Sequence, residues 1–336
     1  MNRRGFLRSA AGLWAATAGV SVISGCAPEP PRPTALRRIG YLSGNTQLSV
    51  DKGSVPFRER LRELGHVEEG DISIVFKIAD NVNVTERLAG YAAELVGMPV
   101  DVLVAVATNA QLAAKKATST IPIVLVLSAD PVGQGLVASF ARPGGNITGV
   151  VTGSLFVTGK QVELLKETVP SLARLAVIGN ATNGTMTLLL PGVEEAAHVM
   201  GVAVDAFPVP SRAELDGVLD RIAAQRFDAL LVLPALSLVR TNDQIPAFAN
   251  KAGLPQIYAD IEFARAGGLM HYGANFAAQH RTAADYVDKI LKGARPADLP
   301  IEQPTQFDLV VNLAAAQELR LTIPDSVMRR ATEFVP

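Results

Sequence analysis

The sequence predicts an α/β fold of two lobes, each a parallel sheet with helices on both faces. The chain has 336 residues, 49% of them apolar, which is enough for two cores at roughly 100–200 residues per domain. Short β-rich runs alternate with helical patterns from Arg37 onward, and the same alternation restarts after residue 150. In such sheets ligands bind beyond the carboxyl ends of the strands. Two lobes facing each other would therefore enclose a cleft.

The first 26 residues predict a signal peptide rather than part of the fold. Residues 3–8 read RRGFLR and resemble a twin-arginine signal, and the apolar stretch 10–23 falls short of the roughly 20 residues that a membrane-spanning helix needs. Ile23-Ser24-Gly25-Cys26 looks like a lipobox, so we expect lipidation at Cys26, the only cysteine. The alternative is an ordinary membrane anchor or buried helix. The proline-dense residues 27–36 predict a stiff tether.

The first half of the mature chain shows four strands and three helices. The strand at 101–106 is a nearly continuous apolar run, typical of a strand covered on both faces. The spacing of Leu88, Ala92 and Leu95 places them on one face of a helix. The expected strands are 38–42, 72–76, 101–106 and 121–127; the expected helices hold Phe57 to Leu64, closed by Gly65, then Leu88 to Leu95, then Thr108 to about Thr118.

The second half repeats this pattern and adds a long helix. The helix begins after Asn275, a plausible N-cap, and stops at Gly293. Pro191 predicts a kink or a later start within its own helix. The expected strands are 174–179, 202–207 and 228–233; the expected helices are 160–168, 186–199, 211–224 and 242–252.

Several strings resemble a family of ABC-transporter substrate-binding proteins that includes the tryptophan/tyrosine-binding type. They occur in order over nearly all of the mature chain, at 57–72, 100–124, 130–150 (DPVGQGLVASFARPGGNITGV), 159–180, 262–273 (EFARAGGLMHYG) and 286–324. The resemblance implies a type I periplasmic-binding fold, two Rossmann-like lobes joined by a three-segment hinge. It implies capture of a small molecule, an amino acid or similar carboxylate, and docking on an ABC permease. The implied location is the periplasm or another extracytoplasmic face.

The resemblance and the two-lobe pattern together predict domain bounds. The N-terminal lobe is expected at 37–151 plus about 265–298, and the C-terminal lobe at 152–264 plus about 299–336. The sequence departs from the family where Pro234 is followed by Ala235-Leu236-Ser237, and in the Gly/Thr-rich stretch 179–186. Both stretches would border the cleft, so the ligand can differ from those of better-known relatives.

Candidate ligand-binding residues in the first lobe follow its strands. Thr108 and Asn109 open a helix whose N-terminal amides and dipole suit a carboxylate, although a simple N-cap is an equal alternative. Ser43 and Ser128 end their strands. Asp130 could pair with a ligand ammonium, but Pro131 after it favours capping of a following helix.

Candidate residues in the second lobe rest on the same strand-end argument and on the resemblance. Tyrosine suits a cleft wall, because its body is apolar and its tip polar, but it is also ordinary at a lobe interface. The candidates are Asn180, Pro234, Tyr258, Glu262 and Tyr272.

Composition argues against other classes of function. The net charge is −1, whereas nucleic-acid binders show a basic surface, so no nucleic-acid partner is expected. The four histidines lack metal-ligand spacing, and a single cysteine cannot build a Cys-based metal site. The glycines at 144–149 lie after an expected helix and before an expected strand. A phosphate-binding loop needs the reverse order, a strand, then glycines, then a helix. We expect no metal, cofactor or catalytic residue. Two alternatives stay open: an enzyme exported by the twin-arginine pathway, and a ligand sensor of the same fold.

Overall fold

The computed structural model describes residues 36–336 apart from 46, 81–82, 182–183 and 235–242, and this part of the chain clusters as one unit. The signal peptide, Cys26 and the tether up to residue 35 lie outside the described residues, as do Ala235-Leu236-Ser237. Within the described part, no helix is long and apolar enough to cross a membrane.

Five parallel strands form the first sheet, in the order β2-β1-β3-β4-β5. They are β1 (Arg37–Ser43), β2 (Ile72–Ile78), β3 (Val102–Val106), β4 (Ile123–Ser128) and β5 (Ile147–Val151). All five residues of β3 are buried, as its continuous apolar run predicted. The predicted parallel sheet is confirmed.

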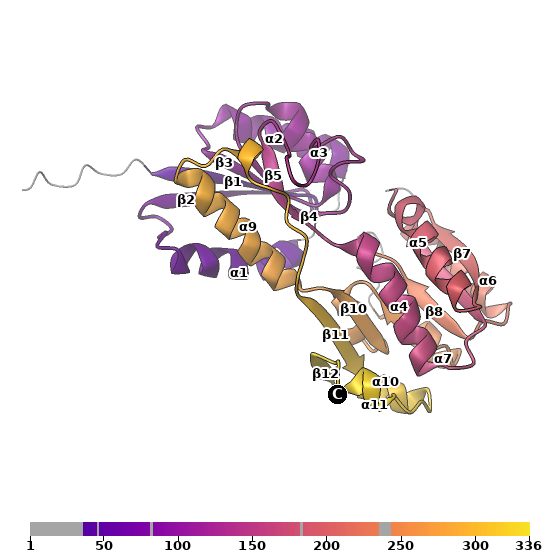
Figure 1. Ribbon diagram of the computed structural model, residues 1–336. Helices are drawn as coiled ribbons and strands as arrows, with labels where there is room; N and C mark the ends of the chain where they lie inside the picture. The colour runs from indigo at the N-terminus through magenta and orange to yellow at the C-terminus, as the bar shows by residue number, and fades with distance from the viewer. Residues whose placement is uncertain (1–35, 46, 81–82, 182–183, 235–242) are drawn as a thin grey trace, which may run out of the picture. The chain divides into compact units, whose positions relative to one another are not determined.

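Helices cover both faces of this sheet (Figure 1). On one face, α1 (Gln47–Glu63) and α9 (Phe276–Leu291) lie alongside each other and pack on a core that includes Tyr41 and Phe57. On the other face lie α2 (Val84–Gly97) and α3 (Thr108–Ala117). Leu88, Ala92 and Leu95 are the buried residues of α2, which confirms the predicted face.

Seven strands form the second sheet, in the order β12-β11-β10-β9-β8-β6-β7. They are β6 (Arg174–Asn180), β7 (Ala203–Val209), β8 (Ala229–Val232), β9 (Gln256–Tyr258), β10 (Met270–Ala274), β11 (Phe307–Asn312) and β12 (Glu333–Val335). The pairs are parallel except β10 with β11, which is antiparallel. The sheet is therefore parallel-dominated rather than wholly parallel.

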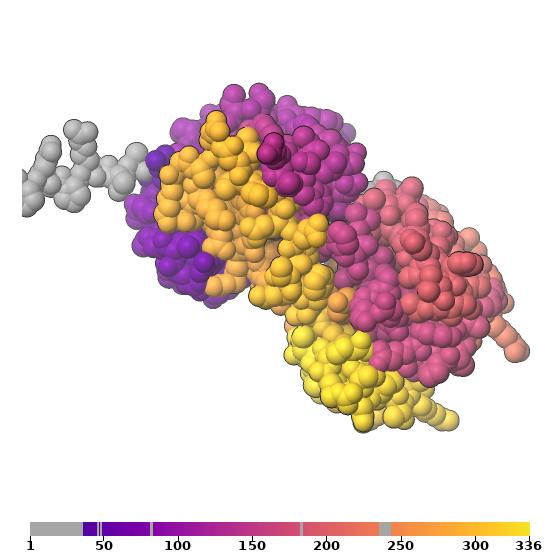
Figure 2. Space-filling view, viewed as in Figure 1, coloured from indigo at the N-terminus to yellow at the C-terminus, as the bar shows by residue number. Residues whose placement is uncertain are grey.

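Helices also cover both faces of the second sheet. One face packs on α4 (Ser154–Thr168) and α5 (Thr185–Val199), together with the short α10 (Leu313–Glu318) and α11 (Asp325–Met328). The other face packs on α6 (Leu215–Ala223), α7 (Gln244–Lys251) and α8 (Ile261–Arg265). In the space-filling view the yellow C-terminal segment lies at the lower end of the second lobe (Figure 2).

The chain passes between the two sheets three times. The passages are residues 151–154, from β5 to α4; 274–276, from β10 to α9; and about 299–307, before β11. The return to the first lobe, expected at about residue 265, therefore comes later, because β10 pairs with β9 and β11 of the second sheet. Local sequence could not show this, since a strand looks the same whichever sheet it joins.

Several local expectations can be compared with the structure. Asn275 caps α9, its Oδ1 accepting from the Ala278 N–H at 2.7 Å, and Gly293 follows with φ of 99°, as predicted. α5 begins at Thr185 with Pro191 inside it, so a later start is wrong. Residues 131–142 form turns and bends, not the helix expected after Pro131 and before the glycines at 144–149.

Candidate functional site

Short polar residues lie along the carboxyl edge of the first sheet. Ser43 is the last residue of β1 and pairs in register with Val106, at the end of the neighbouring β3. Thr108 follows β3 by two residues, and Ser128 ends β4, the next strand. Ser43 and Ser128 are fully buried, whereas Thr108 is half-buried. The strand-end argument thus placed these three residues along one edge.

The backbone at this edge is strained in two places. Ala107, the N-cap residue of α3, has φ 66° and ψ 157°, a region that only glycine adopts readily. Leu127 has φ 56° beside a register shift between β4 and β5. Strain of this kind persists only where surrounding structure enforces it, and it concentrates at ligand sites.

Gln111 holds the backbone on both sides of Ala107 through its side-chain amide, and no local pattern in the sequence pointed to this residue. Its side chain is fully buried, and its Nε2 donates to the carbonyls of Val126 (2.9 Å) and Ala105 (3.4 Å). The Ala107 N–H donates to the same Val126 carbonyl at 2.9 Å. Gln111 therefore ties the ends of β3 and β4 to the first turn of α3.

Among the described residues, no side chain caps the N-terminus of α3. Ala107 at the cap position has no side-chain acceptor, so Thr108 is the first helical residue and not the predicted alternative N-cap. Asn109 is exposed. The Ser128 hydroxyl, buried at the end of the neighbouring strand, has no hydrogen-bond partner among the described residues. An edge with uncapped amides and an unpaired hydroxyl suits an anionic acceptor such as a carboxylate.

Asp130 serves its own turn. Its Oδ1 accepts from the Gly133 N–H at 2.8 Å, and its carboxylate fills the space that a Cβ on Gly133 would need. The capping role is therefore present, although it closes a turn instead of a helix.

The second sheet places its predicted residues less uniformly. Asn180 is the buried last residue of β6, and Pro234 lies two residues after β8, next to the undescribed segment 235–242. Tyr272 on β10 is half-buried; its ring stacks on Phe307 with centroids 5.9 Å apart.

Tyr258 requires a correction, because its side chain is fully buried in the core of the second lobe rather than in a cleft wall. Its ring stacks on Phe263, with centroids 5.0 Å apart and planes at 9°. Burial raises the pKa of its phenol well above the ordinary value. The alternation of side chains along β9 turns this residue toward α7 and α8.

Glu262 takes part in a contact between helices that flank different sheets. Its Oε1 accepts from Lys52 Nζ of α1 at 2.8 Å, and Arg265 lies at 3.6 Å. Lys52 is a residue that the sequence argument missed, since charged residues on an exposed helix face are common and carry no signal of a distant partner.

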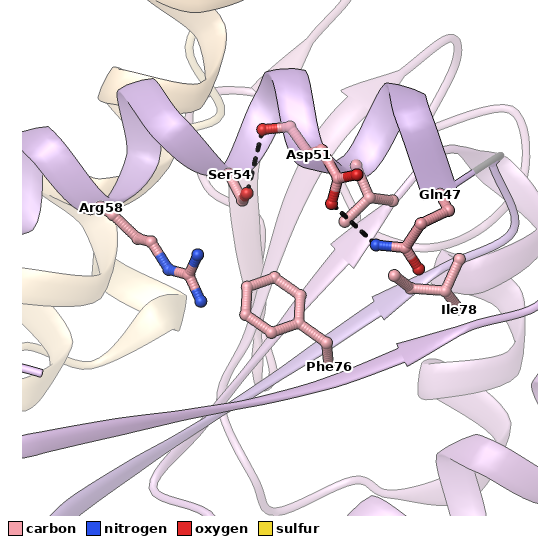
Figure 3. Close-up of a pocket in the computed structure, with 7 residues that line it drawn as sticks. Gln47, Asp51, Ser54, Arg58, Phe76 and Ile78 are labelled. Carbon is pink, nitrogen blue, oxygen red and sulfur yellow. Dashed lines mark hydrogen bonds between the residues drawn. The ribbon is translucent and has the colours of Figure 1, made fainter. Parts of the chain in front are cut away.

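A pocket of about 380 Å³ lies between α1 and the edge strand β2 (Figure 3). Asp51, Ser54 and Arg58 line one wall, and Phe76 lies opposite; Gln47 Nε2 donates to Asp51 Oδ1 at 2.7 Å. The Arg58 guanidinium lies 4.8 Å from the Phe76 ring centroid and also pairs with Glu68 at 3.1 Å. The polar residues at positions 47, 51, 54 and 58 recur at helical spacing, a pattern that places them on one face of α1.

Metal ligands do not gather anywhere in the described part of the chain: it contains no group of three or more His, Cys, Asp or Glu side chains that could hold a metal ion.

Comparisons with known proteins agree on one family. A model of the family described as "ABC transporter substrate binding protein" matches residues 42–335. The chain is 24% identical to the tyrosine-binding protein of Clostridioides difficile over 304 residues, 88% of this chain and 87% of that one.

Solved structures of similar proteins share the fold. A Streptococcus pneumoniae ABC domain in complex with L-Trp superposes with a TM-score of 0.82 at 24% identity, covering 90% of this chain and 100% of that one. A conserved domain protein of Vibrio cholerae gives a TM-score of 0.81 at 27% identity, with 89% and 99% covered. A ligand-free, open substrate-binding protein with adhesive properties from Clostridium difficile gives 0.72 at 22%, also covering 89% and 99%. These neighbours confirm the two-lobe type I periplasmic-binding fold.

Proposed function

This chain belongs to the family of ABC transporter substrate binding proteins, and on that premise we propose that it captures an amino acid or similar small carboxylate for an ABC importer. Proteins of this family work outside the cytoplasm. The tyrosine-binding relative and the L-Trp complex of a structural neighbour support an amino acid as the ligand. The residues of the first sheet's carboxyl edge support a carboxylate.

The observation that carries the ligand proposal is the uncapped N-terminus of α3 beside a buried, unpaired hydroxyl. The first amides of a helix carry a partial positive charge and have no intrahelical acceptor. Thr108 adds a hydroxyl at the same turn, and Ser128 supplies another from the adjacent strand. A ligand carboxylate would accept hydrogen bonds from these groups and relieve the cost of leaving them unpaired.

Closure of the two lobes is the mechanism that this arrangement supports. Candidate residues lie on both sheets, so a ligand held by both would gain contacts only in the closed state and shift the population toward it. The Lys52–Glu262 pair already joins a helix of one lobe to a helix of the other in this structure. Tyr272, Asn180 and Pro234 stay candidates for the second half of the site, and no catalytic residue or cofactor is needed for this role.

We further propose that the protein is a lipoprotein anchored through Cys26, because the twin-arginine-like leader ends in a lipobox and a proline-rich tether follows. Two or three acyl chains, at about 0.8 kcal/mol per buried CH₂, would hold it stably at a membrane surface near its permease. The variant Cys26→Ser should move from the membrane fraction to the soluble fraction; retention at the membrane would contradict the anchor.

The test is a thermal-shift screen of the purified chain without its leader against amino acids and matched amines lacking the carboxylate. A true ligand at 100 times its Kd adds about 2.7 kcal/mol of stability. Thr108→Val and Ser128→Ala should each weaken binding of that ligand about tenfold, the loss of one hydrogen bond to a charged group. Ser119→Ala, at the opposite end of α3, is the matched control and should bind normally.

Two results would overturn the proposal. Amines that bind as tightly as the corresponding amino acids would remove the carboxylate from it. Turnover of any bound compound, or a flavin, haem or metal carried by the purified protein, would favour an exported enzyme instead.

A further inference from the structure

Two of the three passages between the sheets touch each other at a glycine and a proline. Gly153 lies in the passage from β5 to α4, and Pro304 lies in the passage before β11; both passages can be followed in Figure 1. A Cβ added at Gly153 would lie 2.6 Å from Pro304 Cγ and 3.2 Å from its Cδ. Ordinary contacts between carbon atoms measure about 3.5–4.0 Å. The two passages can therefore lie this close because residue 153 has no side chain.

On the side of the first sheet, backbone hydrogen bonds tie these two passages together. Val150 and Glu302 form a parallel bridge. The Val151 N–H donates to the Glu302 carbonyl at 3.0 Å, and the Glu302 N–H donates to the Gly149 carbonyl at 2.9 Å. The backbone up to residue 151 in one passage, and up to residue 302 in the other, is thus held to the first lobe.

On the side of the second sheet, the segment before β11 is tied to the passage from β10 to α9. Ala274 pairs with Phe307 at the end of the antiparallel ladder, and the Asn275 N–H extends this ladder by donating to the Gln306 carbonyl at 2.9 Å. Residues 303–305 therefore lie between the bonds that belong to the first lobe and those that belong to the second. Pro304 is the middle residue of this stretch.

Gly153 occupies the matching place in the other passage, next to the candidate ligand site. The N–H of Thr152, the residue before it, donates to the Ser128 carbonyl at 2.7 Å. Ser128 carries the buried hydroxyl that we propose as a donor to the ligand. Thr152 is thus held to the first lobe, whereas Ser154 is already the first residue of α4 in the second lobe. A change of backbone angle at Gly153 would alter the position of the ligand edge relative to the second lobe.

The conformations of both residues suit a pivot and a stop. Gly153 is the N-cap residue of α4, with φ 68° and ψ 9°, a left-handed conformation that glycine adopts without strain. Hinges are a few loop or element-terminal residues that absorb the change in φ and ψ when lobes move. Pro304 is stiff, because its ring fixes its own φ.

We propose that Gly153 is a positioning residue for the ligand site, the pivot about which the second lobe turns, and that Pro304 is the stop that limits this turn. The missing side chain at residue 153 allows the approach of the two passages that brings both sheet edges to one ligand. The effect on binding rests on the proposed function, because the pivot matters to a ligand only if both lobes hold it. The movement itself needs no ligand.

The test measures the distance between the lobes in the purified chain without its leader and without Cys26, the only cysteine. Glu86→Cys on α2 and Asp220→Cys on α6, both at exposed positions, each take one spin label. Pulsed electron paramagnetic resonance gives the distance between the labels with no ligand and with excess L-tryptophan. Gly153→Ala should shift the ligand-free distance by about 2–4 Å, because the passages must part by about 1 Å at the pivot and the displacement grows toward the labels.

Two further variants distinguish a pivot from a merely strained turn. Gly184→Ala adds the same methyl group at the N-cap of α5, where the backbone is nearly the same, φ 72° and ψ −6°, and nothing lies within 4 Å of the new Cβ. This control should leave the distance unchanged. Pro304→Ala removes the ring atoms that the methyl group would meet. The double variant Gly153→Ala/Pro304→Ala should therefore return to the original distance, although the backbone strain at residue 153 remains.

A distance that Gly153→Ala leaves unchanged would overturn the proposal, as would a shift that Pro304→Ala does not reverse. Should Gly153→Ala not fold, Pro304→Ala alone decides: the loss of the stop should broaden the ligand-free distances, and an unchanged distribution contradicts it. Calorimetry should show about a tenfold loss of L-tryptophan affinity in Gly153→Ala and recovery in the double variant. If no amino acid binds the unmodified protein, the proposed function fails, while the ligand-free distances still decide the pivot.

Discussion

The carboxyl edges of the two sheets carry different kinds of side chain. Along the first edge, β1 and β4 end in Ser43 and Ser128, and β3 is followed directly by Ala107. The backbone there is strained, and the Ser128 hydroxyl has no hydrogen-bond partner among the described residues. Along the second edge, β9 ends in Tyr258, whose large ring is drawn into the core. Small side chains must stay at the edge where the backbone puts them, whereas a large apolar ring gains from burial. Position at a strand end is therefore a better guide to a site for small residues than for aromatic ones.

The sharpest way to break this comparison is to change Tyr258. Tyr258→Ala should lower the free energy of unfolding by about 3–5 kcal/mol, the usual cost of removing a buried aromatic side chain. Tyr258→Phe removes only a hydroxyl that has no partner among the described residues, so stability should change by less than about 1 kcal/mol. Urea denaturation measures both. If Tyr258→Phe kept its stability and lost ligand affinity tenfold, the residue would belong in the cleft after all.

Acid should destabilise both lobes, because each lobe contains a buried histidine. Burial lowers the pKa of His271 on β10 and of His280 on α9 from 6.5 to about 4. The folded state therefore favours neutral rings, and the stability that each contributes is full above pH 6.5 and is lost as the pH falls toward 4. Each should contribute on the order of 3 kcal/mol.

Replacing each histidine in turn would show which lobe loses stability first as the pH falls. His271→Gln and His280→Gln should each flatten the fall in stability between pH 6.5 and 4, measured by denaturation at stepped pH. His198→Gln, at an exposed position on α5, is the control and should leave the curve unchanged. If the stability of both buried variants fell with pH in parallel with that of the unmodified protein, other groups would govern the acid response.

Gln111 offers a smaller and more specific perturbation of the first edge. Gln111→Leu removes the amide that holds the ends of β3 and β4, so we expect a loss of about 1–3 kcal/mol of stability and weaker ligand binding. Ala107→Gly should instead stabilise by about 1 kcal/mol, since glycine adopts this backbone conformation without strain.

Calorimetry of ligand binding alongside denaturation separates the two effects of Gln111. Gln225→Leu, an exposed position after α6, controls for the substitution itself. Ligand affinity unchanged in Gln111→Leu would limit that residue to holding the fold.

Much of the first lobe could be predicted from local patterns. The face of α2, the buried run of β3 and the Asn275 cap depend on residues within a few positions of one another, so periodicity and capping rules reveal them. The candidate site could be predicted only in part. Ser43, Thr108 and Ser128 could be predicted because they lie at or just after the ends of strands. Gln111 and Lys52 could not be predicted, because their partners lie on other elements.

The sequence by itself determined that the chain alternates strands and helices twice, where most of those elements begin and end, and which small polar residues close the first strands. Only the tertiary structure decided that β10 joins the second sheet, that β11 runs antiparallel to it, that residues 131–142 form turns, and that Tyr258 faces the core. The first set follows from contacts between near neighbours in the chain. The second depends on which distant segments pack together, and the free energy of that packing is shared among residues that no short stretch of sequence contains.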